Sequence, residues 1–369
     1  MTDAQLEKLL APLLEIYNQI EIELLLNVAM RFDTYETIGG SLDWYLKRMQ
    51  DMGAFNKKNL AIIKKYSTKS KSYINKMLKS VGYNTMLTNG EMNLETLMKS
   101  VANRRIIESV IQSAEQGIEI INTKALESAN KHYMNILTKG YVETASGIYS
   151  YQESIQKALV EMARRGITGA SYARNGNVAQ YSLEGTVRRD ILTRAHQLSV
   201  DVQMQNVKEL GGNLVYVSQH LGARVSHTDP IANHAGWQGK VYMVEGSSDK
   251  YDNLVEATGY GDIKGLAGVN CRHHIYPYIE GVTKIPDRIS EEENERVYEL
   301  SQQERKMERD VRKAKKELAV YKYIGDPDLI KKGKNKLKAR TAKLDDFVKA
   351  NKELKRDYNR TRVVEELRK

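Results

Sequence analysis

Apolar residues recur every three or four positions along the first 165 residues of the chain. The first such stripe covers residues 3–31, and the same period continues through residues 59–80 and 95–165, with interruptions near Gly117, Gly140 and Gly147. A period of about 3.6 residues is typical of amphipathic α-helices. Residues 1–165 are therefore expected to form a helical N-terminal array.

The apolar stripe of this array has two interpretations. It can form the core of the chain's own antiparallel bundle, which is the usual fate of such stripes. Alternatively, part of it, above all the segment ELLLNVAM at residues 23–30, can dock on a helix of a partner. Packing in the chain's own core is the favoured interpretation, but the sequence does not separate the two.

The pattern changes after residue 165. An Asn175-Gly176 pair between short segments that contain Tyr172 and Tyr181 is typical of a β-hairpin. A helix that begins at Ser182 or Thr186 is stopped by Gly211-Gly212, directly before an apolar strand. That strand covers residues 214–217, and a second is expected at residues 241–244. Residues 166–286 are therefore assigned to one α+β module.

The last part of the chain, residues 287–369, is again helical in pattern. The sequence Gly-Asp-Pro-Asp at residues 325–328 divides it into two helices, expected at residues 290–323 and 329–367. A long helical hairpin with a narrow apolar stripe usually packs on a neighbour. The whole chain is thus predicted to be mainly α with a small α+β module between a helical array and a long C-terminal helical hairpin.

The chemistry of the chain is concentrated between residues 214 and 278. This stretch contains five of the seven histidines, the only cysteine and one of the two tryptophans. Glycines and a proline lie between these residues, so loops are expected to bring them to one small core. The residues predicted to meet there are His220, Arg224, Trp237, Cys271 and His273. Together with His227 they are the candidates for a structural motif or for ligands of a metal.

A metal site is one interpretation of this motif. Cys271 and His273 offer a soft and a borderline ligand, and His220, His227 and His234 could complete a tetrahedral zinc site. The spacing contains neither a CxxC pair nor two histidines on one helical turn. Packing through hydrogen bonds is therefore favoured, no cofactor is expected, and zinc is the alternative.

Catalytic signatures are absent from the sequence. It contains no GxSxG, HExxH or GxxxxGK[ST] motif, and the glycines of TGYGDIKGLAG follow a loop rather than a strand. A nucleophilic dyad of Cys271 with a histidine is conceivable in chemical terms. No catalytic residue is assigned, and an enzyme, either a metal-dependent hydrolase or a toxin-like transferase, is kept as the alternative class.

Charge and cysteine content narrow the classes further. One cysteine and the lack of a secretory leader at the start predict a protein of a reducing, cytosol-like compartment. The longest apolar patch, residues 20–30, is interrupted by Glu21 and Glu23, so no membrane span is expected. The net charge of +10 favours an anionic partner, which also leaves a nucleic-acid-binding regulator as a third class. Six basic residues begin the second tail helix: Lys331, Lys332, Lys334, Lys336, Lys338 and Arg340.

Several segments together resemble the phage minor capsid protein family of tailed phages and prophages. They are SQHLGARVSHTDP, WQGKVY, TGYGDIKGLAGVNCRHHIYPYIEG and QQERKMERDVRKAKKE. The resemblance implies a structural minor head protein without established enzymatic activity, made in the bacterial cytoplasm and placed in the virion, in the capsid interior or at the portal vertex. Its implied roles are head assembly and DNA packaging or ejection. Its implied partners are the portal protein, the major capsid protein and packaged double-stranded DNA. The six basic residues are candidates for contact with DNA or with the portal protein. The alternative is that they form a charged helix face exposed only to solvent.

Overall fold

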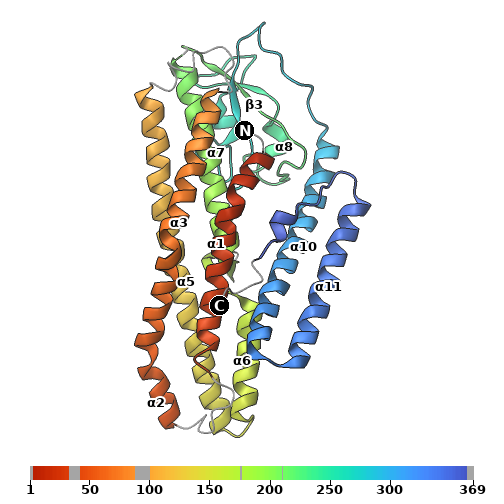
Figure 1. Cartoon of the computed structure of the whole chain (residues 1–369). Helices are drawn as coiled ribbons and strands as arrows, with labels where there is room; N and C mark the ends of the chain where they lie inside the picture. The colour runs from red at the N-terminus through yellow and green to blue at the C-terminus, as the bar shows by residue number, and fades with distance from the viewer. Residues whose placement is uncertain (1–2, 33–41, 88–99, 175–176, 210, 364–369) are drawn as a thin grey trace.

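Long α-helices dominate the computed structural model, which describes residues 3–32, 42–87, 100–174, 177–209 and 211–363. Helices α1 (Asp3–Ala29), α3 (Met52–Leu87), α5 (Val101–Ala145) and α7 (Leu183–Glu209) run side by side along the molecule, while α2 (Leu42–Gln50) and α6 (Tyr151–Arg165) lie at one end (Figure 1). The 45 residues of α5 span about 68 Å at 1.5 Å per residue. The predicted fold class, mainly α with a small α+β module, is confirmed.

The apolar stripe of α1 lies inside the bundle. Leu24, Leu25 and Val28 have no exposed surface and belong to one core with side chains of α3, α5, α6 and α7. Residues 24–29 are therefore buried within the chain, and the alternative that this segment forms a docking stripe for a partner is wrong. None of the described helices is both long and apolar enough to cross a lipid bilayer.

Gly117 and Gly140 do not interrupt α5, contrary to the sequence prediction. A Cβ atom on Gly117 would lie 2.8 Å from the Arg194 guanidinium of α7, and one on Gly140 would lie 2.7 Å from Ile155 of α6. Both glycines thus mark places where a neighbouring side chain approaches the helix closely. The break at Gly147, in contrast, is real, because this residue follows α5 with a φ of +70°.

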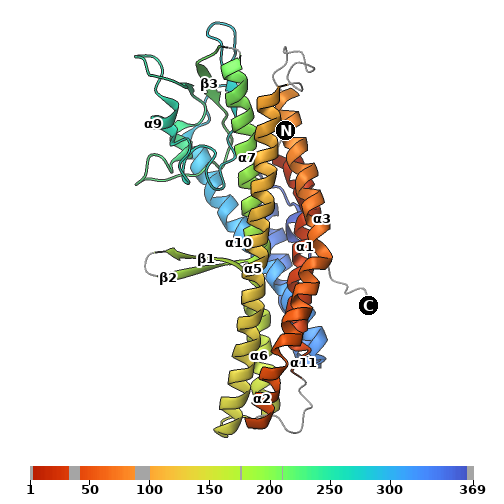
Figure 2. The ribbon, with the colours of Figure 1, turned by 90° about the vertical axis from the view of Figure 1, so that its left-hand side faces the viewer.

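A two-stranded antiparallel hairpin of β1 (Thr168–Arg174) and β2 (Asn177–Ser182) projects sideways from the bundle (Figure 2). Its rings of Tyr172 and Tyr181 pack edge to face, and the guanidinium of Arg189 lies over both. The expected turn at residues 175–176 lies outside the described residues. The predicted pairing of the flanking segments is present.

The central module is built on a three-stranded antiparallel sheet. Strand β3 (Leu214–Val217) lies between β4 (Val241–Met243) and β5 (Ile275–Pro277), and the short helices α8 (His234–Trp237) and α9 (Leu254–Thr258) complete the module. Helix α7 serves two cores, because its N-terminal part packs in the bundle while Val200 and Val207 pack in the module. The predicted division at residues 165 and 286 stays a prediction.

The C-terminal hairpin consists of α10 (Glu291–Ile324) and α11 (Pro327–Ala350). It turns where predicted, with Gly325 at a φ of +79° and Asp326 accepting hydrogen bonds from the first backbone amides of α11. The second helix ends at Ala350 rather than at residue 367, so that part of the prediction is wrong. The Asn351 side-chain amide donates to the Phe347 carbonyl and closes the helix.

After α11 the chain returns along α10 through a 3-10 turn, η1 (Tyr358–Thr361). Arg360 donates to Glu308 of α10 at 2.9 Å, and Val363 is buried against Ile22 and Leu26 of α1. The ion pair with the buried Glu308 carboxylate and the apolar contact with α1 thus stabilise the segment that follows α11. The helical pattern of the sequence could not predict this return of the chain. The contacts that hold it are made with residues of α10 and α1, far away in the sequence.

Buried ion pairs attach α10 to the bundle. Lys316 Nζ lies 2.6 Å from Glu21 Oε2 of α1, and Arg312 Nε lies 2.8 Å from Glu184 Oε2 of α7. Burial alone would raise the pKa of the Glu184 carboxyl, but the charges of Arg312, Lys316 and Arg188 outweigh it and leave that pKa below its usual value. The neighbour on which the hairpin packs is therefore the chain's own bundle.

Candidate functional site

The histidine-rich stretch folds into a buried cluster in the module. Helix α8 supplies His234 and Trp237, and the segment that leads into β5 supplies Cys271 and His273. Ligand atoms of His234, Cys271 and His273 all lie within 4.8 Å of one another, and the three side chains are buried. The module therefore gathers a thiol and two imidazoles at one point.

The side chains of residues 271–274 point to two sides because the backbone before β5 is extended. Successive side chains of an extended segment point to opposite sides, so Cys271 and His273 share one side while His274 faces the other. Cys271 Sγ lies 3.5 Å from His273 Nδ1 inside the module. His274 Nδ1 lies 3.1 Å from Ser199 Oγ of α7.

The two buried imidazoles are each fixed by an oxygen acceptor. His273 Nε2 lies 3.0 Å from Gln238 Oε1, and His234 Nε2 lies 2.7 Å from the Lys264 carbonyl oxygen. Since these oxygens only accept hydrogen bonds, each Nε2 carries the proton. Burial lowers the pKa of His273 well below its usual value and that of His234 to about 4. Both rings are therefore neutral at pH 7 and carry a lone pair on Nδ1.

The glycine-rich loop before Cys271 is folded tightly on itself. A Cβ atom on Gly265 would lie 2.2 Å from the Gly259 carbonyl oxygen, and Ala267 and Asn270 adopt positive φ angles of 59° and 61°. Arg224 donates to the carbonyls of Lys264 and Val269 across this loop. The glycines thus permit close packing of the loop, which positions Cys271.

Aromatic contacts complete the cluster. The His220 ring stacks on the His273 ring at a centroid distance of 4.6 Å, and the Trp237 ring packs edge-on against His273 at 4.7 Å. Trp237 Nε1 donates to the Ile231 carbonyl at 3.1 Å. The structure therefore brings together four of the predicted residues, His220, Trp237, Cys271 and His273, with Arg224 supporting the loop beside them.

His227 does not join the cluster. Its side chain is 77% exposed and its Nε2 lies 3.0 Å from Glu295 Oε1 of α10. His234 is the third potential ligand instead; the sequence had named it as a possible zinc ligand but had not included it in the predicted motif. The seven-residue spacing of the histidines could not distinguish them, because the loop between His227 and α8 decides which one turns inward.

The six basic residues of α11 fall into two groups. Lys336 Nζ lies 2.7 Å from the buried Glu317 carboxylate, and Arg340 Nη1 lies 3.1 Å from Asp310 Oδ2, so both are engaged with α10. The other four are exposed and have no ion pair with any described acidic residue. They form what is called here the α11 lysine face: Lys331, Lys332, Lys334 and Lys338.

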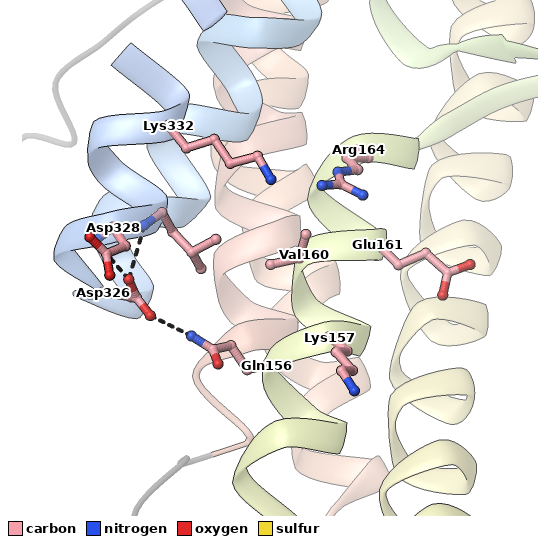
Figure 3. A pocket seen from close by; sticks show the side chains of 9 residues that line it. Gln156, Lys157, Val160, Glu161, Arg164, Asp326, Asp328 and Lys332 are labelled. Carbon is pink, nitrogen blue, oxygen red and sulfur yellow. Dashed lines mark hydrogen bonds between the residues drawn. The ribbon is translucent and has the colours of Figure 1, made fainter. Parts of the chain in front are cut away.

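A cavity of about 670 Å³ lies beside this face, between α6 and α11. Lys157 and Arg164 of α6 line it opposite Lys332, and Arg164 and Lys332 extend into the space between the helices (Figure 3). Gln156 donates to Asp326 at 2.6 Å along its edge. Sequence reasoning missed Lys157 and Arg164, because only the tertiary packing places α6 beside the turn of the hairpin.

Comparison with known proteins identifies the family. The phage minor capsid protein 2 family matches residues 1–349. The chain belongs to this family. The family resemblance inferred from the sequence is thus confirmed, and the match includes the helical bundle, the module and most of the C-terminal hairpin.

Two relatives are named structural protein. One, from Lactococcus phage LL-H, is 27% identical over 338 residues, which cover 86% of this chain and 88% of the relative. The other, from Lactococcus phage mv4, is 36% identical over 116 residues, which cover 31% of this chain and 94% of the relative. No solved structure matches this chain significantly. The protein is accordingly a structural head protein of a bacteriophage and a component of the virion.

Proposed function

We propose that this minor capsid protein lies in the capsid interior at the portal vertex, where it contacts the portal protein and the major capsid protein, and where its α11 lysine face contacts packaged DNA. The observation that carries the DNA contact is the exposure of four lysines on an outer helix. Lys331, Lys334 and Lys338 follow each other at intervals of three and four residues, so they share one side of α11. A row of cations at this spacing can neutralise neighbouring phosphates.

The local electrostatics of α11 support an anionic partner. The first turn of a helix carries partial positive charge, and Lys331 and Lys332 lie in the second turn of α11. Asp326 and Asp328 offset part of this charge at the start of the helix. Across the cavity, Lys157 and Arg164 add two further cations. A phosphate backbone lying along α11 would relieve this accumulation of like charge.

The DNA contact predicts a strong salt effect for the purified protein. Replacing Lys331, Lys332, Lys334 and Lys338 together by glutamine should weaken duplex binding, because each phosphate contact contributes about 0.9 to the slope of log K against log salt. The slope should therefore fall by up to about 3.6. Fluorescence anisotropy with a random-sequence duplex at several salt concentrations measures this.

The control for that variant uses four exposed lysines of α3, which lie on another part of the bundle: Lys57, Lys58, Lys64 and Lys69. Their replacement by glutamine removes the same total charge and should leave most of the slope intact. Equal losses in both variants would indicate nonspecific charge attraction, and an unchanged slope in the α11 variant would contradict the DNA contact.

The portal location is tested separately in purified virions. Chemical cross-linking followed by mass spectrometry should connect lysines of this protein to the portal protein and to the inner surface of the major capsid protein. Cross-links confined to tail proteins or to the outer capsid surface would contradict the location without affecting the measurement on DNA.

We propose that the protein acts without catalysis. Cys271, the one thiol of the chain, is buried with no exposed surface, as is His273 beside it. A nucleophile must reach its substrate, so this thiol and imidazole could react only after the module opened. Their burial supports a structural role for the pair.

A further inference from the structure

The buried thiol and imidazoles of the module have the composition of a transition-metal site. Cysteine and histidine are the ligands that zinc prefers, whereas magnesium and calcium prefer oxygen ligands. We propose that His234, Cys271 and His273 bind one Zn²⁺ ion. The site ties α8 to the segment before β5, and its role is to stabilise the module.

Distances within the cluster fit this coordination. Zinc bonds of about 2.3 Å to sulfur and about 2.05 Å to nitrogen, at a tetrahedral angle, separate the two ligand atoms by about 3.6 Å. Cys271 Sγ and His273 Nδ1 lie 3.5 Å apart. The third ligand atom, from His234, lies within 4.8 Å of both, so a shift on the order of 1 Å brings it to bonding distance. Two ligands are in position, and the third needs only a small side-chain movement.

The surroundings of both histidines match those of metal ligands. Histidines that bind metals usually donate their second ring N–H to a carbonyl or carboxylate, which fixes the tautomer and ring orientation. Here the Nε2 atoms of His273 and His234 are fixed by Gln238 and by the Lys264 carbonyl. Each Nδ1 is thereby left as the nitrogen with a lone pair, and His273 presents it to the Cys271 sulfur.

The backbone conformation of the turn before Cys271 also fixes the position of its thiol. Ala267 and Asn270 adopt left-handed conformations, which are costly for residues with a side chain. Cys271 N donates to the Gly268 carbonyl at 3.1 Å and closes the last turn. When zinc binds, the Cys271 thiol releases its proton to solvent and the thiolate sulfur donates an electron pair to the ion. The energy of that bond would offset the strained turn.

Metal content of the full-length protein tests the proposal directly. Protein purified without chelators should contain about one zinc per chain by inductively coupled plasma mass spectrometry. Cys271→Ser and His234→Ala should each lose most of this zinc. His227→Ala is the matched control, because His227 is a histidine of the same module that lies outside the cluster, and it should retain zinc.

A second measurement guards against variants that fail to fold. Wild-type protein stripped of metal and loaded with Co²⁺ should show the absorption band of a cobalt–thiolate bond, and its melting temperature should fall with a chelator and recover with Zn²⁺ but not with Mg²⁺. Wild-type protein that lacks zinc, shows no such band and melts unchanged with chelator would overturn the proposal. Zinc that persists in Cys271→Ser would also overturn it.

Discussion

Replacing Lys316 by methionine should lower the free energy of unfolding by about 3–5 kcal/mol, because it leaves the buried Glu21 carboxylate without its cation. The Lys316 ammonium lies 2.6 Å from Glu21 Oε2, and the two side chains are 7% and 2% exposed. Methionine keeps most of the volume of the lysine stem, so the loss of unfolding free energy comes mainly from the removal of the positive charge. Urea titration followed by circular dichroism measures it.

Two further variants show whether the loss comes from the buried pair. Lys71 and Glu119 form a surface pair at 2.7 Å, and Lys71→Met should cost no more than about 1 kcal/mol. Adding Glu21→Gln to Lys316→Met should recover much of the stability, since no buried charge is then left alone. A loss from Lys316→Met no larger than that from Lys71→Met would show that the pair does not fix α10 on the bundle.

Replacing Trp237 by alanine should cost about 3–5 kcal/mol, the usual result of removing a buried aromatic side chain. The indole is 3% exposed and packs against the rings of His234 and His273. Its loss leaves a cavity at the centre of the module and removes the hydrogen bond to the Ile231 carbonyl. The same urea titration measures this loss.

The matched variant for this position is Trp237→Phe. Phenylalanine fills part of the cavity but cannot donate to Ile231, so its cost should lie well below that of alanine. If both variants unfold like the wild type, Trp237 is not an anchor of the module core. A large and equal cost for both would instead assign the stabilisation to the hydrogen bond.

Element type and order followed from local pattern. The 3.6-residue period located α1 and α10, glycine and proline located the turn at Gly325, and β3 was placed at its observed residues. These features depend on backbone preferences and on apolar spacing within a few turns, which a sequence displays directly. The family resemblance was likewise carried by short segments whose residue types are visible without a fold.

Contacts between distant segments were decided only by the tertiary structure. Gly117 was expected to break a helix, but it permits Arg194 of α7 to approach α5 closely. The end of α11 depends on Asn351 and on the return of the chain toward α1, which no local period predicts.

The candidate site divides in the same way. The sequence predicted that a thiol and imidazoles meet in one small core, and Cys271 and His273 do lie together there. The choice of His234 over His227, and the pairing of Lys336 with Glu317, were decided by tertiary packing. The sequence alone cannot show which of several histidines or lysines will be buried. That depends on where the fold places each side chain.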